Sequence, residues 1–360
     1  MWTHIGGHPG MKVFRTDNGR IRKVAEVPAD KHGMYPNFTP QEIYEINIEA
    51  VANEGRMLRL MAGSGFAPAL LHQEHWGNWI EEEDLGETTP IRDAELWRQN
   101  CVRLLAAIRA RNIRHGDLTG SNMIIREHDR PYAIDWHEAH MIGEPPPQKS
   151  PYSDSYLLWR AVMNTVGPTG VADTPRVARR WLAVLGALGA DKQFTLPLRG
   201  KTFLDLGCFQ GDFVAMAATE GMYAIGVDQG GFRTGEDSIQ NAERMWKDLP
   251  FGTMSFWKKD ILRVESYACD VVLLFSTWPY IVKNFGVPPA MQLISDIVGA
   301  CGSFFFETQL YGDGPGPEFL KTDSDVEAML RRFGHVTNVA TFPVTGRPAS
   351  RTVWKVEARQ

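Results

Sequence analysis

The sequence has no long hydrophobic run, no strongly basic segment, no internal repeat and no low-complexity tract. Its longest apolar stretch, residues 271–282, is interrupted by Ser276, Thr277 and Pro279 and is too short to cross a bilayer. The first residues contain no cationic segment followed by an apolar core, so we expect no secretory signal and a cytoplasmic protein. These absences exclude a membrane-spanning protein from the expected classes.

Cysteine and charge content disfavour two further classes without excluding an RNA partner. The four cysteines have no CxxC or other metal-ligand spacing, which predicts reduced thiols rather than disulfides or a zinc site. They are Cys101, Cys208, Cys269 and Cys301. A formal net charge of −5 without a basic run argues against a dominant nucleic-acid-binding surface. At 360 residues, the chain is long enough for two ordinary domains.

The first half of the sequence alternates short strand-like runs with helical patterns. "MKVFRT" and "RIRKVAEV" flank an Asp-Asn-Gly turn and predict a hairpin, and a second hairpin is predicted around "WGN". Apolar residues at helical spacing predict helices over "IEAVANEGRMLRLMAG" and over Arg92–Arg111. We expect a domain over residues 1–170, with a small strand-rich lobe over about residues 1–84 and a larger lobe over about 85–170.

The stretch "IRHGDLTGSNMII", Ile113–Ile125, has the residues of a phosphoryl-transfer site. This chemistry requires metal ions on the phosphate oxygens, a cation on the phosphates that are not transferred, and a carboxylate that orients the attacking hydroxyl. We expect Asp117 to orient or deprotonate that hydroxyl. Asn122, five residues later, and Asp135, after a short predicted hairpin, are the expected metal ligands.

Upstream residues complete the phosphoryl-transfer pattern. Lys23 lies on the second strand run and Glu54 in the following helix. In this chemistry, a helix Glu holds a strand Lys in place as the cation that binds the phosphates. We expect Glu82 and Asp84 beside the adenine of ATP, although the run Glu81–Asp84 also fits a solvated turn. A lone His-x-Asp motif would also fit a loop aspartate whose carboxylate only accepts hydrogen bonds from backbone amides. The prediction of a phosphoryl-transfer site therefore depends on the joint occurrence of these residues.

This order of residues resembles the protein-kinase-like superfamily over about Gly6–Val166. "HGDLTGSNMII" is particularly similar to the small atypical kinase of the KEOPS tRNA-modifying complex and to lipopolysaccharide and sugar kinases, which share glycine at Gly116. The resemblance implies a bilobal α+β fold that uses ATP and Mg²⁺. Asp135-Trp136-His137 replaces Asp-Phe-Gly, no APE-type segment follows, and "GGHPG" is not a GxGxxG loop. We therefore expect no activation loop regulated by phosphorylation.

The second half, residues 177–360, has the pattern of a Rossmann-like α/β domain. The apolar runs "TFLDLG", "YAIGVD", "VVLLFS" and "SFFFETQ" alternate with helical segments and predict a mostly parallel sheet. The last run, "VTNVATFPVTGRPASRTVWKVEA", predicts two strands at an antiparallel edge.

A nucleoside-binding pattern begins at "FLDLGCFQGDF". A buried strand ends at Gly207, a helix begins near Gly211, and the next strand ends at Asp228, where a carboxylate accepts hydrogen bonds from ribose hydroxyls. This much also fits a dinucleotide enzyme or a structural Gly-rich turn. The Asp-x-Gly-x-x-x-Gly spacing differs from a pyrophosphate loop, however, and a third strand end offers Asp260 to an adenine amino group.

These motifs resemble those of class I S-adenosylmethionine-dependent methyltransferases over about Val177–Glu357. The resemblance assigns Asp205, Gly207 and Gly211 to the methionine part of the cofactor, Asp228 to the ribose, and Asp260 with Ile261 to the adenine.

The acceptor side is expected around "LFSTWPYIV", residues 274–282. The absence of N/D-P-P-Y disfavours methylation of a base amino group. Methyl transfer to an anionic oxygen needs alignment rather than a strong base. Candidate contacts are Tyr280, Gln309, Arg347 and Arg351, each of which also fits a structural or surface role. Arg347 and Arg351 share a loop that could clamp a phosphate.

The two constellations together resemble the bifunctional kinase–methyltransferases that terminate bacterial O-antigen polysaccharides. In that family the methyltransferase comes first and a coiled coil follows, unlike here. The resemblance implies two reactions on a glycan or small-molecule acceptor. The first phosphorylates a hydroxyl, and the second is an O-methylation whose acceptors include the phosphate so formed. Two alternatives stay open: a kinase-like ATPase module that docks a tRNA or protein for the methyltransferase, and a small-molecule pathway enzyme.

Overall fold

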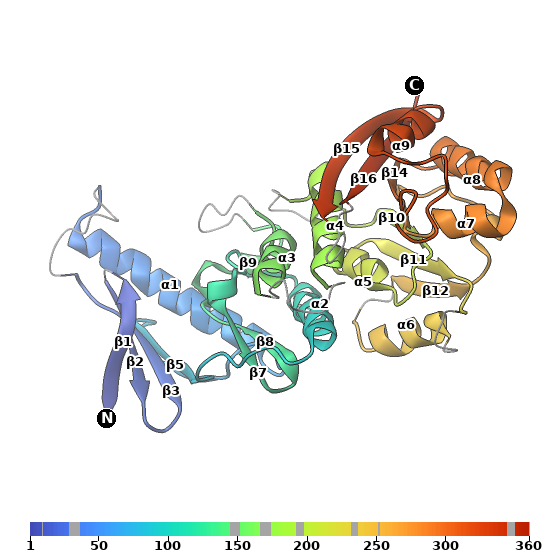
Figure 1. Cartoon of the computed structure of the whole chain (residues 1–360). Helices are drawn as coiled ribbons and strands as arrows, with labels where there is room; N and C mark the ends of the chain where they lie inside the picture. Colours follow the sequence, from blue (N-terminus) through green and yellow to red (C-terminus); the bar gives the residue numbers. More distant parts are fainter. Residues whose placement is uncertain are drawn as a thin grey trace. The chain divides into compact units, whose positions relative to one another are not determined.

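The computed structural model describes residues 1–8, 10–28, 37–144, 152–165, 174–191, 198–231, 237–250, 253–343 and 350–359, without the side chains of residues 163–165 and 174–175. The chain forms two compact units, Met1–Thr165 and Val166–Gln360 (Figure 1). Within the described ranges, no helix has both the length and the apolar character needed to span a membrane.

The first unit contains a five-stranded antiparallel sheet. In spatial order its strands are β1 (Trp2–His8), β2 (Met11–Thr16), β3 (Arg20–Ala25), β5 (Trp79–Glu83) and β4 (Leu70–Gln73). The two predicted hairpins, β2–β3 and β4–β5, are confirmed. The sequence patterns do not predict β1, because its side chains are exposed or half-buried without regular alternation.

Helix α1 (Pro40–Met61) connects β3 to β4 and packs on this sheet (Figure 1). Thr39 and Glu42 form a capping box that satisfies the first amides, so the helix begins before Ile48, where the predicted pattern starts. The buried face of α1 is mostly apolar but includes Glu54, whose carboxyl group is fully buried. A charged group in this place requires a partner.

The main elements in the described remainder of the first unit are two helices and two pairs of short antiparallel strands, of which β7–β8 is a hairpin. The elements are α2 (Ala94–Ala110), β6 (Ile113–Arg114) paired with β9 (His140–Met141), β7 (Met123–Arg126) paired with β8 (Arg130–Ala133), and α3 (Asp154–Thr165). The loop between β6 and β7 contains Asp117 and Asn122, and Asp135 follows β8. The candidate residues therefore lie on loops that short paired strands hold in place.

The second unit is built on a seven-stranded mixed sheet. In spatial order its strands are β12 (Met254–Lys258), β11 (Tyr223–Asp228), β10 (Thr202–Leu206), β13 (Val271–Phe275), β14 (Ser303–Glu307), β16 (Ser350–Ala358) and β15 (Gly334–Pro343). The first five are parallel, and β16 and β15 are antiparallel to their neighbours. The predicted Rossmann-like arrangement with an antiparallel edge is confirmed.

Helices accompany the strands of the second unit (Figure 1). They are α4 (Thr174–Ala187), α5 (Asp212–Thr219), α6 (Ser238–Trp246), α7 (Trp278–Phe285), α8 (Val287–Ala300) and α9 (Asp323–Leu330). Helix α4 contributes the fully buried Trp181. Its ring packs edge-on against that of Phe203, with 6.0 Å between centroids, and at a tilt against that of Phe213, with 6.3 Å between centroids. This helix is thereby part of the core beside β10 and α5.

The carboxyl ends of the parallel strands meet at one edge of the sheet. Gly207 follows β10, Asp228 ends β11, Ser276 follows β13 and Glu307 ends β14. The register pairs Phe275 with Glu307 across β13 and β14. The candidate residues of the second unit are therefore gathered by strand order.

Two glycines at this edge are required by packing within the protein. Gly207 and Gly211 have φ values of 84° and 75°, which favour glycine. A Cβ added at Gly207 would overlap the Thr277 side chain, and one at Gly211 would overlap the ring of Phe256. The missing Cβ atoms thus make room for neighbouring side chains of the same unit.

Gly211→Ala should lower the free energy of unfolding by about 2–5 kcal/mol, because it adds left-handed backbone strain to overpacking against Phe256. Gly299→Ala in α8 is the matched control, since nothing lies within 4 Å of its added Cβ. It should stabilise the protein by about 0.5–1 kcal/mol. Urea unfolding followed by circular dichroism measures both, and equal effects would contradict the packing argument.

Candidate functional sites

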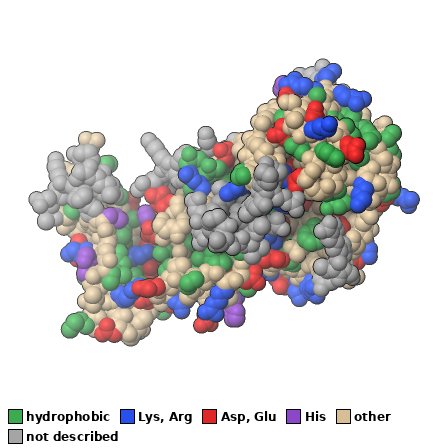
Figure 2. All heavy atoms as spheres, viewed as in Figure 1, with side chains coloured by type: hydrophobic (Ala, Val, Ile, Leu, Met, Phe, Trp, Pro, Cys, Tyr) green, Lys and Arg blue, Asp and Glu red, His purple; other side chains and the backbone are tan. Residues whose placement is uncertain are grey.

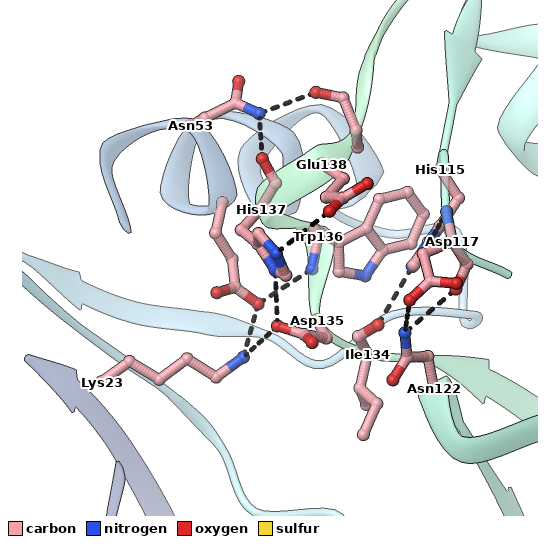
Figure 3. A network of polar contacts seen from close by, with 12 residues as sticks. Lys23, Asn53, His115, Asp117, Asn122, Ile134, Asp135, Trp136, His137 and Glu138 are labelled. Carbon is pink, nitrogen blue, oxygen red and sulfur yellow. Dashed lines mark hydrogen bonds and ion pairs between the residues drawn. The ribbon is translucent and has the colours of Figure 1, made fainter. Parts of the chain in front are cut away.

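Lys23 is surrounded by carboxylates of the first unit, and Figure 3 shows its contact with Asp135. Its ammonium is 2.6 Å from Glu54 Oε1, 3.3 Å from Glu82 Oε1 and 3.7 Å from Asp135 Oδ1. Burial disfavours the ammonium, but the carboxylates outweigh it and raise the pKa of Lys23 above its usual range. Four predicted site residues, which come from β3, α1, β5 and the segment after β8, are therefore brought together.

The two predicted contacts to adenine have different surroundings. Glu82 is buried beside Lys23, and its Oε2 has no hydrogen-bond partner among the described residues. Burial and the charge of Glu54, opposed by Lys23, raise the pKa of Glu82 to about 7. Asp84 instead forms an ion pair with Arg15, with 2.7 Å between Arg15 Nε and Asp84 Oδ2. Only Glu82 thus joins the group around Lys23.

Asp117 and Asn122 are held together within the loop between β6 and β7. Asn122 Nδ2 donates to the Asp117 carbonyl at 3.0 Å and to Asp117 Oδ2 at 2.8 Å (Figure 3). Gly116 has a φ of 84°, and an added Cβ would lie 2.8 Å from the carbonyl oxygen of Glu138. Glycine at this position therefore lets the loop pass close to the segment after Asp135.

Asp135 has a left-handed backbone conformation, with a φ of 64°. His137 Nδ1 donates to Asp135 Oδ1 at 2.8 Å. Burial would raise the pKa of Asp135, but the hydrogen bond from His137 and the charge of Lys23 hold it well below its usual range. Because its side chain is 38% exposed, this anionic carboxylate can still reach a ligand.

The loop and the Asp135 segment are adjacent. The amide of Ile134 donates to the carbonyl of Asn122 at 3.0 Å. Nothing among the described residues donates to Asn122 Oδ1, which is compatible with metal binding. The described residues contain no group of three His, Cys, Asp or Glu side chains that could hold a metal ion. Mg²⁺ is commonly held by one or two carboxylates together with substrate phosphates, so Asn122 and Asp135 fit a nucleotide-bound ion.

Asp154, at the start of α3, is a supporting residue that the sequence patterns did not single out. Its fully buried carboxylate accepts hydrogen bonds from the amides of His115 and Gly116, at 2.9 and 3.0 Å. Burial opposes its charge, but Arg109 and Arg114 hold the pKa of Asp154 below its usual range. Its signal in the sequence is an aspartate near the start of "SDSYLLWRAVMNTV", residues 153–166, whose pattern is helical. Asp154 fixes the backbone that leads into Asp117.

In the second unit, Asp205 is a buried carboxyl group without a complete set of partners. It is 3% exposed on β10, and its Oδ2 has no hydrogen-bond partner within the described part of the chain. Burial and the charges of Asp228 and Asp212, opposed by Arg180, raise the pKa of Asp205 to about 8. A ligand ammonium would supply the missing donor, so this position fits the amino group of S-adenosylmethionine.

The Asp228 carboxylate accepts a hydrogen bond from the loop that follows β10. Its Oδ2 accepts from the amide of Phe209 at 3.1 Å, and its Oδ1 accepts from the amide of Gly230 and the hydroxyl of Ser238, at 3.0 and 2.9 Å. Phe209 itself has a φ of 48° and is 46% exposed. The predicted ribose contact therefore lies beside the glycine loop, where it also stabilises that loop.

Asp260 and Ile261 begin a short 3₁₀ turn after β12. Asp260 Oδ1 accepts from the amide of Leu262 at 3.0 Å, and the Tyr267 hydroxyl donates to the carbonyl of Ile261 at 2.7 Å. Ile261 is buried and Asp260 is partly exposed. The two predicted adenine contacts are thus held rigidly at the third strand end.

A buried ionic network at the ends of β13 and β14 includes predicted and unpredicted residues. Arg351 Nη2 lies 3.0 Å from Asp313 Oδ2, and its Nη1 lies 3.4 Å from Glu307 Oε1. Arg180 also pairs with Glu307. Both guanidinium groups donate to the Ser276 hydroxyl, at 3.0 Å from Arg180 and 3.1 Å from Arg351. Of these five residues, the sequence patterns predicted only Arg351 as a contact.

The other acceptor candidates are divided. Gln309 is 8% exposed after β14, and its Oε1 lacks a hydrogen-bond partner among the described residues. Tyr280 is half-buried in the first turn of α7. Arg347 lies outside the described residues. Arg351 and Gln309 are therefore the predicted candidates with buried polar groups. Gln309 follows β14, and Arg351 lies on the neighbouring strand β16.

Asp154→Ala should lower the free energy of unfolding of the first unit by about 3–5 kcal/mol, because it removes one partner from a buried charged network. Asp17→Ala is the control, since the Asp17 side chain is 90% exposed, and it should change the free energy by less than about 0.5 kcal/mol. Denaturant unfolding of the full chain measures both. Equal stability of the two variants would contradict the supporting role of Asp154.

No protein-family model matches this chain. No curated protein matches it either. Solved structures do match, among them WbdD, a bifunctional kinase-methyltransferase, at 19% identity and a TM-score of 0.39, covering 50% of this chain and 38% of WbdD. Magnesium protoporphyrin IX methyltransferase (ChlM) from Synechocystis PCC 6803, with bound S-adenosylmethionine, matches at 18% identity and a TM-score of 0.38, covering 51% of this chain and 79% of ChlM. EvdMO1 matches at 18% identity and a TM-score of 0.37, covering 53% of this chain and 43% of EvdMO1.

Proposed function

We propose that this chain is a bifunctional transferase with one site in each unit. Residues 1–170 form a kinase-like domain that transfers phosphate from ATP to a hydroxyl. Residues 177–360 form a class I methyltransferase domain that uses S-adenosylmethionine for O-methylation. The phosphate that the first domain attaches is among the proposed methyl acceptors. The observation that carries the proposal is the assembly of Lys23, Glu54, Asp135, Asp117 and Asn122 into one region of the first unit.

Each residue of the first site has a chemical role in this proposal. Lys23, held by Glu54, binds the phosphates that are not transferred, and Asp117 orients the acceptor hydroxyl and takes its proton. Asn122 and Asp135 hold Mg²⁺, which supplies charge neutralisation on the phosphates. Glu82 faces the nucleotide from β5, and Asp84 fixes the end of that strand through Arg15.

The second site is proposed to bind its cofactor along the strand ends. Asp205 accepts from the ammonium of S-adenosylmethionine, Asp228 from the ribose hydroxyls and Asp260 from the adenine amino group, beside Ile261. The glycine loop at Gly207 brings backbone close to the cofactor, whose sulfonium supplies an electrophilic methyl group.

The methyl acceptor is proposed to lie at the ends of β13 and β14. Tyr280, Gln309 and Arg351 are the proposed contacts, and they align the accepting oxygen with the methyl group. Arg347, which lies outside the described residues, stays a contact proposed from the sequence alone. The buried arginine Arg351 is already paired with carboxylates, so it orients an acceptor oxygen by hydrogen bonding rather than by unbalanced charge.

A glycan or related small acceptor fits the charge distribution better than an RNA. Figure 2 shows Lys and Arg side chains interspersed with Asp and Glu on the visible face of each unit, over the described residues. Nucleic-acid binding usually depends on a basic stripe or patch and falls steeply with salt. RNA that copurifies and dissociates steeply with salt would favour the alternative of a kinase-like docking module.

Asp117→Asn should reduce phosphate transfer at least about 100-fold, because the group that orients and deprotonates the hydroxyl is lost. The measurement is incorporation of γ-labelled phosphate from ATP into a cell-envelope glycan extract. S-adenosylhomocysteine affinity, measured in the same preparation, should stay unchanged. Asp17→Asn serves as the control. Wild-type transfer by the Asp117 variant would refute the assignment.

S-adenosylhomocysteine affinity should rise as the pH increases from 6 to 8. In the free protein the pKa of Asp205 is about 8, so the carboxyl group is largely protonated at low pH, whereas the ligand ammonium favours its ionised form. Asp205→Asn should weaken binding and flatten the pH dependence. Asp248→Asn, a control at an exposed position after α6, should do neither. Calorimetry measures affinity and proton release, and an affinity of the wild-type protein that is independent of pH would contradict the role.

A further inference from the structure

The segment after Asp135 is attached to helix α1 by side chains of two consecutive helix residues. Asn53 Nδ2 donates to the carbonyl of His137 at 2.8 Å and to the carbonyl of Ala139 at 2.7 Å (Figure 3). Glu54 Oε1, which binds Lys23, also accepts from the amide of Trp136 at 3.0 Å. One helix thus binds three backbone groups of the segment that carries Asp135.

The Asn53 side chain has one orientation that satisfies all of its groups. Arg56 Nη2 donates to Asn53 Oδ1 at 3.0 Å, which directs the amide nitrogen toward the two carbonyls. Because both amide hydrogens are used, neither a carboxylate nor an apolar side chain of similar size can replace them. The attachment therefore depends on an asparagine and not only on the size of the side chain.

The opposite side of the segment is fixed as well. The fully buried indole of Trp136 donates to the carbonyl of Ala133 at 2.8 Å. Its ring lies 4.5 Å from that of His115, between centroids, and His115 in turn donates from Nε2 to the carbonyl of Ile134 at 3.0 Å. The segment is therefore held between α1 and the start of the loop that carries Asp117.

We propose that Asn53 is a positioning residue that locks the Asp135 segment to α1, so that the metal-binding carboxylate and the Lys23–Glu54 pair form one preassembled unit. The inference rests on the proposed phosphoryl-transfer function and adds to it the residue that sets the geometry of the metal site. Glu54 and Asp135 cannot move apart without loss of these hydrogen bonds. The site is thus ready for Mg²⁺ and nucleotide without a separate activation step.

The test is the dependence of ATP affinity on Mg²⁺, measured by calorimetry with excess Mg²⁺ and with EDTA. In the wild-type protein Mg²⁺ should strengthen ATP binding, and Asp135→Asn should abolish that gain. Asn53→Leu preserves the side-chain size but removes both donors, so the gain should fall about 10-fold or more, as when an outer partner of a metal ligand is lost. Affinity for ATP in EDTA should change less than about twofold.

Gln41→Leu is the matched control, because it makes a similar amide-to-apolar change at an exposed position of the same helix, away from the Asp135 segment. It should leave the Mg²⁺-dependent gain within about twofold of the wild-type value. Asn53→Asp keeps the shape of the side chain and replaces the donors with an acceptor, so it should also lose the gain. If Asn53→Leu binds no ATP even in EDTA, the Asn53→Asp variant provides the test of the positioning role instead.

The outcomes separate this inference from the proposed function. If the wild-type protein binds no ATP in either condition, the phosphoryl-transfer function fails. If the wild-type protein shows the Mg²⁺-dependent gain and both Asn53 variants retain it, the positioning role fails while the function stands.

Discussion

The buried ion pair between Lys23 and Glu54 is the interaction on which the site of the first unit depends. It joins the sheet to helix α1, and through the second hydrogen bond of Glu54 it reaches the amide of Trp136. An ammonium in this interior would lose its charge without carboxylates, and carboxylates without the ammonium would be unpaired. The pair therefore requires the strand, the helix and the Asp135 segment to meet. That meeting leaves a fixed cation and a partly exposed carboxylate at its edge, which suits the phosphate-binding role proposed for this region.

The second unit follows a different constraint, which is the order of its strands. Parallel strands place Gly207, Asp228 and Ser276 at one edge without any direct pairing among them. At this edge, Asp205 is buried with an oxygen that lacks a donor among the described residues, while Asp228 binds the loop that follows β10. The unit thus combines a rigid loop with a buried acceptor atom. That combination suits a ligand that carries both an ammonium and a ribose, as the proposed cofactor does.

Much of this architecture could be predicted from the sequence, because local patterns determine it. The hairpins follow from turn residues between β-branched runs, and the parallel sheet follows from apolar strands that alternate with helices. β1 was missed because its side chains are mostly exposed, and the start of α1 was missed because a capping box rather than apolar spacing sets it. Supporting residues such as Asp154, Asn53 and Arg180 bind backbone groups or side chains far away in sequence, and no local pattern reports such contacts. Even Gly207 and Gly211, which the motif predicted, lie against Thr277 and Phe256, which only the fold brings near.

In the proposed function, each unit has its own cofactor site. The most direct measurement is calorimetric titration of Mg²⁺–ATP into the protein saturated with S-adenosylhomocysteine, and the reverse titration. One equivalent of each ligand should bind, with neither ligand displacing the other. Competition for a single site, or the absence of binding by both ligands, would contradict it.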